Sequence, residues 1–135
     1  MKLIKKAMTV MVVMLAAVMV MVTGGCKKAD FDINGNWYVE FSLESSGAFN
    51  VGFTGSETSG SVIYASQFSG EYVVENKDVE FVVRIQVVLD TITELFVYEF
   101  KGVFTDADHM NGTVSAYLAN VPSSATNGTW NAERL

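Results

Sequence analysis

The sequence predicts an all-β protein, an antiparallel up-and-down barrel of about eight strands preceded by a helical N-terminal targeting segment. After the first 25 residues, apolar and polar side chains alternate along most of the chain, which is the period of a half-buried strand. Short runs of glycine, asparagine and serine separate these stretches, and no helical period interrupts them. One proline, nine phenylalanines and five tyrosines also favour strands over disorder. At 135 residues the chain has room for one domain.

Residues 1–25 have the composition of a targeting segment. Lys2, Lys5 and Lys6 give it a positive start, and residues 7–22 then carry no charge and only one polar side chain. This is the arrangement of a secretory signal peptide, which is removed from the mature protein. The apolar run is also just long enough to span a tilted or thinned bilayer, so an uncleaved anchor is the alternative.

The only cysteine follows this apolar run directly. Val22-Thr23-Gly24-Gly25-Cys26 resembles the lipobox of bacterial lipoproteins, in which small residues precede a cysteine that receives a diacylglycerol before cleavage. The resemblance implies that Cys26 is the lipidated N-terminus, that residues 26–30 are a tether to the membrane, and that residues 31–135 form the barrel domain. The protein is then expected in the bacterial cell envelope, at the outer membrane if the bacterium is Gram-negative, because Lys27 rather than aspartate follows the cysteine. The alternative for Cys26 is a small buried thiol.

The charge of the domain excludes one class of partner. From residue 29 onward, fifteen acidic residues stand against four basic ones, a formal charge of −11; the basic residues are Lys77, Arg84, Lys101 and Arg134. Nucleic-acid binding requires clustered lysines and arginines to neutralise phosphates, and no such cluster exists here. We therefore expect no nucleic-acid partner.

The first four strands are predicted from alternation and from the breaks between apolar runs. A clear alternating pattern starts at Trp37, and small or polar residues end the runs that follow. The join near Gln67 has the weakest signal. The predicted strands are 37–44, 49–53, 61–66 and 68–75, with turns at 45–47, 55–60 and 76–78.

A long hairpin follows, and its register can be predicted. If Asp90-Thr91 is a two-residue loop, one face of the hairpin is almost entirely apolar and Glu80 lies opposite Lys101 on the other face. A slip of one residue would lose both features. The predicted pairs on the apolar face are Leu89 with Ile92, Val87 with Glu94, Ile85 with Phe96, Val83 with Tyr98, and Phe81 with Phe100.

The last two strands complete the count of eight. Residues 105–110 are predicted to turn, 111–119 to form the seventh strand, 120–127 to form a loop around the only proline, and 128–135 to form the eighth strand. Eight antiparallel strands with short connections favour an up-and-down barrel, and a two-sheet sandwich is the alternative.

The two ends of the domain carry a family resemblance. Phe31-Asp32-Ile33-Asn34-Gly35-Asn36-Trp37-Tyr38 resembles the Gly-x-Trp opening of lipocalins and their calycin relatives, and residues 128–134 resemble the final strand of small bacterial lipocalin-like lipoproteins. The resemblance implies that Gly35 and Trp37 close one end of the barrel and that Arg134 packs across the tryptophan. An even number of strands brings both ends of the domain to the same end of the barrel, within reach of a cation–π contact.

The inward face of the barrel supplies the candidate pocket. The predicted lining residues are Phe81, Ile85, Glu94, Phe96, Tyr98, Phe100 and Tyr117. Glu94 lies next to the hairpin turn, at the end opposite Trp37, where it either meets a polar or cationic group of a ligand or reaches water at the rim. The inward aromatic rings either line a pocket for a small hydrophobic ligand or fill the barrel.

No catalytic or metal centre is predicted. His109 is the only histidine, so neither a histidine cluster for zinc nor a histidine-based triad has support within one chain. Residues 106–112 resemble a calcium loop, but the glycine falls one position late and no glutamate closes the loop. We expect a non-enzymatic envelope protein without a cofactor that binds a small hydrophobic ligand. The alternative is a filled barrel that acts through an envelope protein, as an adaptor, an inhibitor or a structural accessory.

Overall fold

A computed structural model describes residues 28–135. The predicted signal peptide, residues 1–25, and the predicted lipidation site, Cys26, lie outside the described residues. Eight strands make up nearly all of the described chain: β1 (Gly35–Ser42), β2 (Ser46–Gly55), β3 (Ser59–Tyr64), β4 (Gln67–Glu75), β5 (Asp78–Leu89), β6 (Ile92–Asp106), β7 (His109–Leu118) and β8 (Val121–Arg134).

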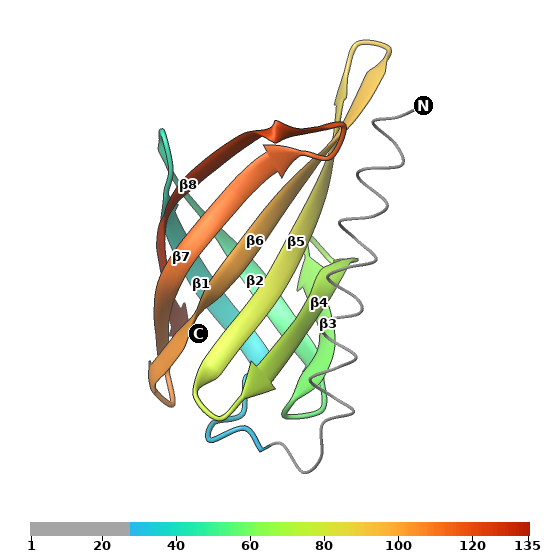
Figure 1. Cartoon of the computed structure of the whole chain (residues 1–135). Coiled ribbons are helices and arrows are strands. Elements are labelled where there is room, and N and C mark those ends of the chain that lie inside the picture. Colours follow the sequence, from blue (N-terminus) through green and yellow to red (C-terminus); the bar gives the residue numbers. More distant parts are fainter. Residues whose placement is uncertain (1–27) are drawn as a thin grey trace.

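The strands form one closed antiparallel barrel (Figure 1). Each strand pairs with the next along the chain, and β8 returns to pair with β1, where Trp37 lies opposite Arg134 and Phe41 opposite Trp130. The prediction of an all-β, eight-stranded up-and-down barrel is therefore confirmed, and the sandwich alternative is wrong. Closure gives every strand two neighbours, so free edges remain only where a ladder is shorter than its strands, as in β2 before Gly52 and in the hairpin of β5 and β6 beyond Phe96.

The predicted hairpin register is confirmed at every pair. Leu89 lies opposite Ile92 across the Asp90-Thr91 turn, and the ladder continues through Phe81 opposite Phe100 to Glu80 opposite Lys101. Asp90 has a φ of 56°, a conformation that aspartate tolerates better than most residues. Local turn chemistry and the apolar face of the hairpin therefore select the same register.

One predicted loop belongs to a strand. Residues 121–127, expected as a loop around the proline, are the first half of β8: Val121 lies opposite Leu118 of β7, and the regular ladder begins again at Thr126 opposite Ala116. The connection between the two strands is only Ala119 and Asn120. The ladder shifts register between Ala116 and Leu118, and such an irregularity accommodates a proline near the start of a strand.

Aromatic rings fill the middle of the barrel. Phe81 of β5 and Phe100 of β6 stack with ring centroids 4.4 Å apart and planes 5° from parallel. The Phe53 and Trp130 rings meet Phe81 edge-on, at centroid distances of 5.1 Å and 5.3 Å. Phe53, Phe81, Phe100 and Trp130 are each at most 3% exposed. These rings therefore form the hydrophobic core and leave no room for a ligand between them.

Two glycines make space for one of these rings. Gly102 of β6, Gly112 of β7 and Trp130 of β8 lie in one row across three neighbouring strands. A Cβ atom on Gly112 would lie 1.9 Å from the carbonyl oxygen of Lys101, and one on Gly102 would lie 2.8 Å from the indole of Trp130. The indole nitrogen donates a hydrogen bond to that same Lys101 oxygen at 3.1 Å. The indole of Trp130 therefore fits because the two neighbouring positions of its row, Gly102 and Gly112, carry no side chain.

Among residues 28–135 the chain forms no helix with the length and apolar character needed to cross a membrane.

Candidate functional site

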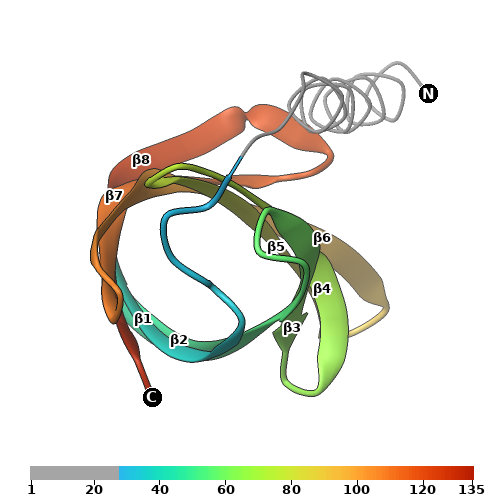
Figure 2. The same cartoon turned by 90° about the horizontal axis from the view of Figure 1, so that it is seen from below.

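The residues before β1 close one end of the barrel. This segment crosses the opening when the barrel is viewed along its axis (Figure 2). Ile33 is fully buried and accepts a hydrogen bond at its carbonyl oxygen from the indole nitrogen of Trp37, at 2.8 Å. Asn34 holds the segment to the wall, because its side-chain oxygen accepts from the backbone nitrogen of Gly55 at 2.8 Å. The side chain of Asn34 also donates to Asp32, which lowers the pKa of that carboxyl group.

Arg134 fastens this closed end from the last strand. Its guanidinium group lies over the Trp37 ring, 4.4 Å from the ring centroid. The same group donates to the carbonyl oxygens of Asn34, Asp32 and Ala107 at 2.8, 2.6 and 2.9 Å. Gly35 is close below it, with a φ of 123° that residues with a side chain rarely adopt. The three residues that the family resemblance assigns to closure therefore lie together at one end.

The chain enters the barrel at this same end. The backbone nitrogen of Asn76, in the turn between β4 and β5, donates to the carbonyl oxygen of Lys28 at 2.6 Å, and Asp30 donates back to Asn76 at 2.9 Å. Phe31 packs on Phe104 with ring centroids 5.3 Å apart. The predicted tether is thus bound to the barrel from Lys28 onward, which is two residues after the predicted lipidation site.

A pocket of about 310 Å³ opens at the opposite end, which we call the mouth pocket. Phe96 and Tyr98 of β6 face Leu118 and Ala116 of β7 in the ladder, and all four border the pocket together with the β1–β2 turn. The complete lining is Leu43, Glu44, Ser45, Phe96, Tyr98, Ala116, Tyr117, Leu118, Ser124 and Thr126. Burial raises the pKa of the Tyr98 phenol, so the pocket presents a neutral hydroxyl beside apolar surface.

The predicted pocket residues divide into three groups. Phe96 and Tyr98 border the mouth pocket. Phe81 and Phe100 are 1% exposed and belong to the core, and Ile85 packs against that core. The structure places the remaining two, Glu94 and Tyr117, differently from the prediction.

Tyr117 borders the mouth pocket, but its side chain points away from the interior. It lies opposite Val97 in the β6–β7 ladder, one residue out of phase with the inward-facing Phe96 and Tyr98. Its hydroxyl donates to a carboxylate oxygen of Glu99 at 2.7 Å on the outer wall. Burial, followed by the bond to Glu99, raises the pKa of Tyr117 well above its ordinary value. The alternation in the seventh strand alone did not set its register, so the outward position of Tyr117 was not predicted.

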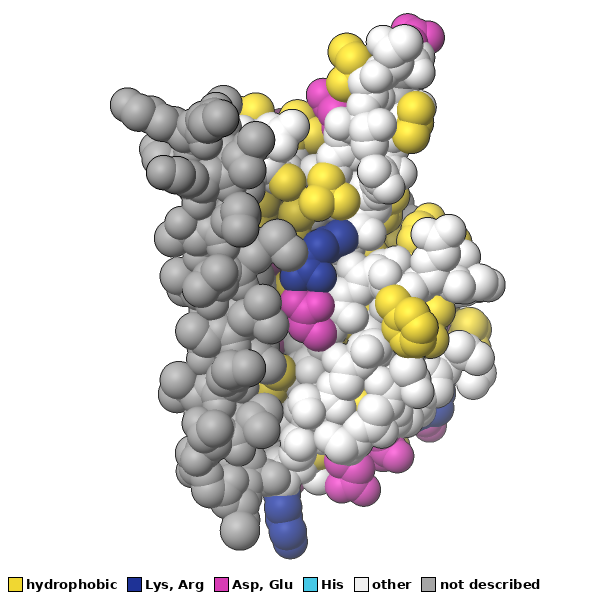
Figure 3. All heavy atoms as spheres, turned by 90° about the vertical axis from the view of Figure 1, so that its right-hand side faces the viewer, with side chains coloured by type: hydrophobic (Ala, Val, Ile, Leu, Met, Phe, Trp, Pro, Cys, Tyr) yellow, Lys and Arg dark blue, Asp and Glu magenta, His cyan; other side chains and the backbone are white. Residues whose placement is uncertain are grey.

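Glu94 lies on a hairpin that projects beyond the mouth (Figure 1). The β6–β7 ladder ends at Phe96 opposite Leu118, whereas the β5–β6 ladder continues to Leu89 opposite Ile92. We call residues 86–95 the arm. On the arm Val88 is 65% exposed and Ile92 is 61% exposed, and apolar side chains stand on it in Figure 3. Glu94 is half-buried there and does not border the mouth pocket.

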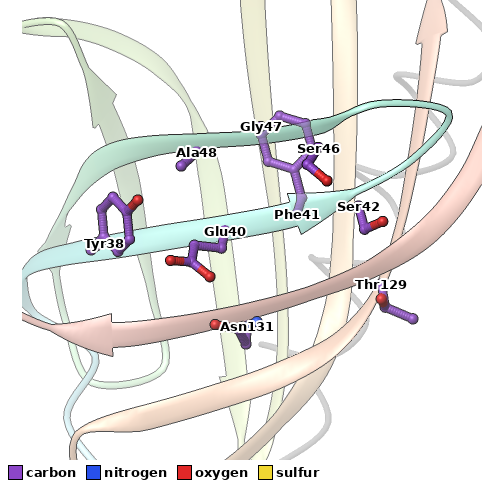
Figure 4. Close-up of a pocket in the computed structure, with 9 residues that line it drawn as sticks. All are labelled: Tyr38, Glu40, Phe41, Ser42, Ser46, Gly47, Ala48, Thr129 and Asn131. Carbon is purple, nitrogen blue, oxygen red and sulfur yellow. The ribbon is translucent and has the colours of Figure 1, made fainter.

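A second hollow lies on the outside of the barrel, over β8, β1 and β2 (Figure 4). This hollow, which we call the outer trough, has a volume of about 430 Å³. Its polar lining was not singled out from the sequence, because alternating polar residues on the solvent side of a strand give no signal of their own. The lining residues are Tyr38, Glu40, Phe41, Ser42, Ser46, Gly47, Ala48, Thr129 and Asn131.

The segment that resembles a calcium loop, predicted to be a turn, is a turn held by its own side chains. The carboxylate of Asp106 accepts from the backbone nitrogen of Asp108 at 2.8 Å and lies 2.8 Å from the Nδ1 atom of His109. The bond to Asp106 raises the pKa of His109. Within residues 28–135, no group of three or more His, Cys, Asp or Glu side chains has the arrangement of a metal site.

No protein-family model matches the chain, and searches of the curated proteins and of the solved structures give no significant match either.

Proposed function

We propose that this protein is a lipid-anchored component of the bacterial envelope whose lipocalin-like barrel binds a small, neutral, apolar molecule at its mouth. The observation that carries the proposal is the mouth pocket, where Phe96, Leu118 and Ala116 give an apolar surface next to the hydroxyl of Tyr98. Its volume of about 310 Å³ lies at the small end of the range of ligand pockets, about 300 to 1,000 Å³. The proposal includes no catalytic step.

The charges around the pocket favour a neutral ligand over an anionic one. Glu44 is the charged residue of the lining, and the domain as a whole is strongly acidic. An apolar molecule with a carboxylate would meet this negative potential without a basic partner in the lining. A molecule with a hydroxyl or carbonyl group can instead bond to the hydroxyls of Tyr98 or Thr126.

The attachment of the chain supports an orientation for the anchored protein. Lys28 is held at the closed end, so a lipid on Cys26 would place the bilayer beneath Trp37 and Arg134. The mouth pocket and the arm would then face away from the membrane. Replacement of Cys26 by serine tests the anchor: we expect the wild-type chain in the membrane fraction with the mass of a lipid added to residues 26–135, and the C26S chain without that lipid. An unmodified wild-type chain would contradict the anchor.

A pair of phenylalanine substitutions tests the ligand. Phe96→Ala removes pocket surface, whereas Phe81→Ala removes a core ring. With the neutral fluorophore N-phenyl-1-naphthylamine as probe, we expect Phe96→Ala to weaken uptake about tenfold. Phe81→Ala should instead lower the free energy of unfolding by about 3 to 5 kcal/mol. Equal uptake by wild-type and Phe96→Ala protein would contradict binding at the mouth.

The second candidate function is protein interaction through the arm. This function is favoured by the aromatic rings that fill the middle of the barrel and by the exposed side chains of Val88 and Ile92. The strand edges of the arm also extend beyond the ladder with β7, where a partner strand can add to them. Val88→Lys with Ile92→Lys would abolish partner capture in this case, and would leave uptake of the fluorophore unchanged.

A further inference from the structure

We propose that the outer trough binds a saccharide chain. The trough lies on the outside wall, so it is separate from the mouth pocket and does not depend on the ligand proposed there. Tyr38 and Glu40 of β1 flank it together with Asn131 of β8 (Figure 4). Its volume of about 430 Å³ falls within the range of about 300 to 1,000 Å³ that is usual for small-molecule sites.

The hollow exists because neighbouring strands carry short side chains in one row of the outer wall and longer side chains in the next row. Ser42 lies between Ser46 of β2 and Thr129 of β8 in one row of the ladder, and none of these three has a long side chain. In the next row Glu40 lies between Ala48 and Asn131. Because side chains of one face stand side by side on neighbouring strands, the short ones form the floor and the longer ones the border.

The polar groups of the trough have unused hydrogen-bonding capacity. The side chains of Tyr38, Glu40 and Asn131 form no hydrogen bond or ion pair with any other residue in the described range 28–135. Elsewhere on the outer wall comparable groups pair with each other: Arg84 donates twice to Glu71, at 2.9 and 2.6 Å, and Tyr117 donates to Glu99. The trough thus offers a carboxylate, an amide and several hydroxyls to a ligand.

The exposed ring of Tyr38 adds an apolar plane to these polar groups. The residue is 37% exposed, so part of its side chain is open to the solvent. An aromatic plane beside convergent donors and acceptors matches a sugar ring, which has an apolar C–H face and a rim of hydroxyls.

Other ligand classes fit the trough less well. Its lining has no lysine, arginine or histidine, which disfavours phosphate and other anions. Strands β8 and β1 are paired on both sides along the trough, and β2 is paired there with β1, so an extended peptide can add only to the far edge of β2 before Gly52, on the side away from β1. The ligand class that fits the trough best is therefore a neutral or amino sugar.

Two soluble oligosaccharides test this site: cellotetraose, built from β-1,4-linked glucose, and chitotetraose, built from β-1,4-linked N-acetylglucosamine. The full chain in a sugar-free detergent would be titrated with each at millimolar concentration, and binding followed by saturation-transfer NMR and amide shifts. We expect at least one to bind, with shifts confined to β8, β1 and β2. Absence of transfer from both oligosaccharides would overturn the proposal.

Matched variants connect the binding to the trough. Tyr38→Ala should weaken the affinity about tenfold, whereas Tyr38→Phe should retain most of it because the ring remains. Phe68→Ala is the control, since Phe68 is a 77% exposed aromatic residue on β4 outside the trough. The Phe68→Ala protein should bind the oligosaccharide with the affinity of the wild type. Asn131→Ala serves as a second trough variant should Tyr38→Ala fail to fold. Unchanged affinity in the folded trough variants would overturn the proposal.

Discussion

The guanidinium group of Arg134 lies 4.4 Å from the centre of the Trp37 ring and also donates to backbone carbonyls of two other segments. One side chain thereby joins the last strand, the segment before β1 and the turn between β6 and β7. These parts of the chain are distant in sequence, and Arg134 and Asn34 are 100 residues apart. The closed end therefore depends on a residue whose planar group can satisfy several carbonyl oxygens at once.

Arg134→Ala should strongly destabilise the barrel. It removes three short bonds to backbone carbonyls and the contact with Trp37, and leaves those oxygens to find other partners. We expect a loss of about 2 to 4 kcal/mol in the free energy of unfolding, measured by urea denaturation. Arg134→Lys should recover only part of it, because an ammonium group lacks the planar fork. Lys101→Ala, at an exposed position, is the control. If Arg134→Ala lowers the free energy of unfolding no more than Lys101→Ala does, the role of Arg134 is contradicted.

Gly112→Ala should destabilise the protein although it adds only one methyl group. The new Cβ would lie 1.9 Å from the carbonyl oxygen of Lys101, so the backbone itself must move. We expect a cost of about 2 to 4 kcal/mol in thermal or urea unfolding. Gly52→Ala is the matched control, since its Cβ would meet the movable side chain of Asn36 at 3.2 Å. Equal stability of the two variants would show that the wall beside Trp130 is not close-packed.

The sequence predicted those parts of the fold in which local and long-range patterns agree. The β5–β6 hairpin is the clearest case, because the Asp90-Thr91 turn and the apolar face demand one register. The β3–β4 turn had no comparable signal. Its central residues, Ala65 and Ser66, have φ values of 52° and 64°, a geometry in which asparagine and glycine are common and alanine is not. Tertiary structure imposes this turn, so the residues do not reveal it.

Ser66→Gly should therefore stabilise the barrel. Glycine adopts a positive φ without the steric cost that serine bears, and the turn keeps its two-residue length. We expect a gain of about 0.5 to 1 kcal/mol in the free energy of unfolding. Ser61→Gly, in the regular part of β3, is the control and should lose stability. If Ser66→Gly also lowers the free energy of unfolding, the positive φ at this turn is contradicted.

The stability of the protein should fall with rising pH in the alkaline range. Burial and the bond to Glu99 raise the pKa of Tyr117, so the unfolded chain loses this proton before the folded one does. The contribution of Tyr117 is therefore complete below the ordinary tyrosine pKa of about 10 and is lost as the pH rises above it.

Urea unfolding of wild-type and Tyr117→Phe protein between about pH 9 and 11 measures this contribution. The variant should show a shallower decline in stability. Its decline should not vanish, because burial also raises the pKa values of Tyr72 and Tyr98. Identical slopes for the two proteins would contradict the assignment to Tyr117.

The candidate sites were predictable to different degrees. Phe96 and Tyr98 were assigned to the pocket because the hairpin register fixed their side of the sheet. Whether Phe81 and Phe100 line a cavity or fill it depends on Phe53 and Trp130, which come from strands distant in sequence. The outer trough depends on the lengths of side chains on three neighbouring strands, and no segment of the sequence shows that relationship alone.

Native mass spectrometry tests the mouth pocket most directly. The barrel, residues 28–135, would be exposed to a lipid extract of bacterial envelopes, and its native mass compared with its denatured mass. We predict one discrete additional mass in the native spectrum, lost on denaturation and absent from Phe96→Ala protein. A folded wild-type barrel that retains no additional mass after this exposure would contradict a ligand at the mouth and would favour interaction through the arm.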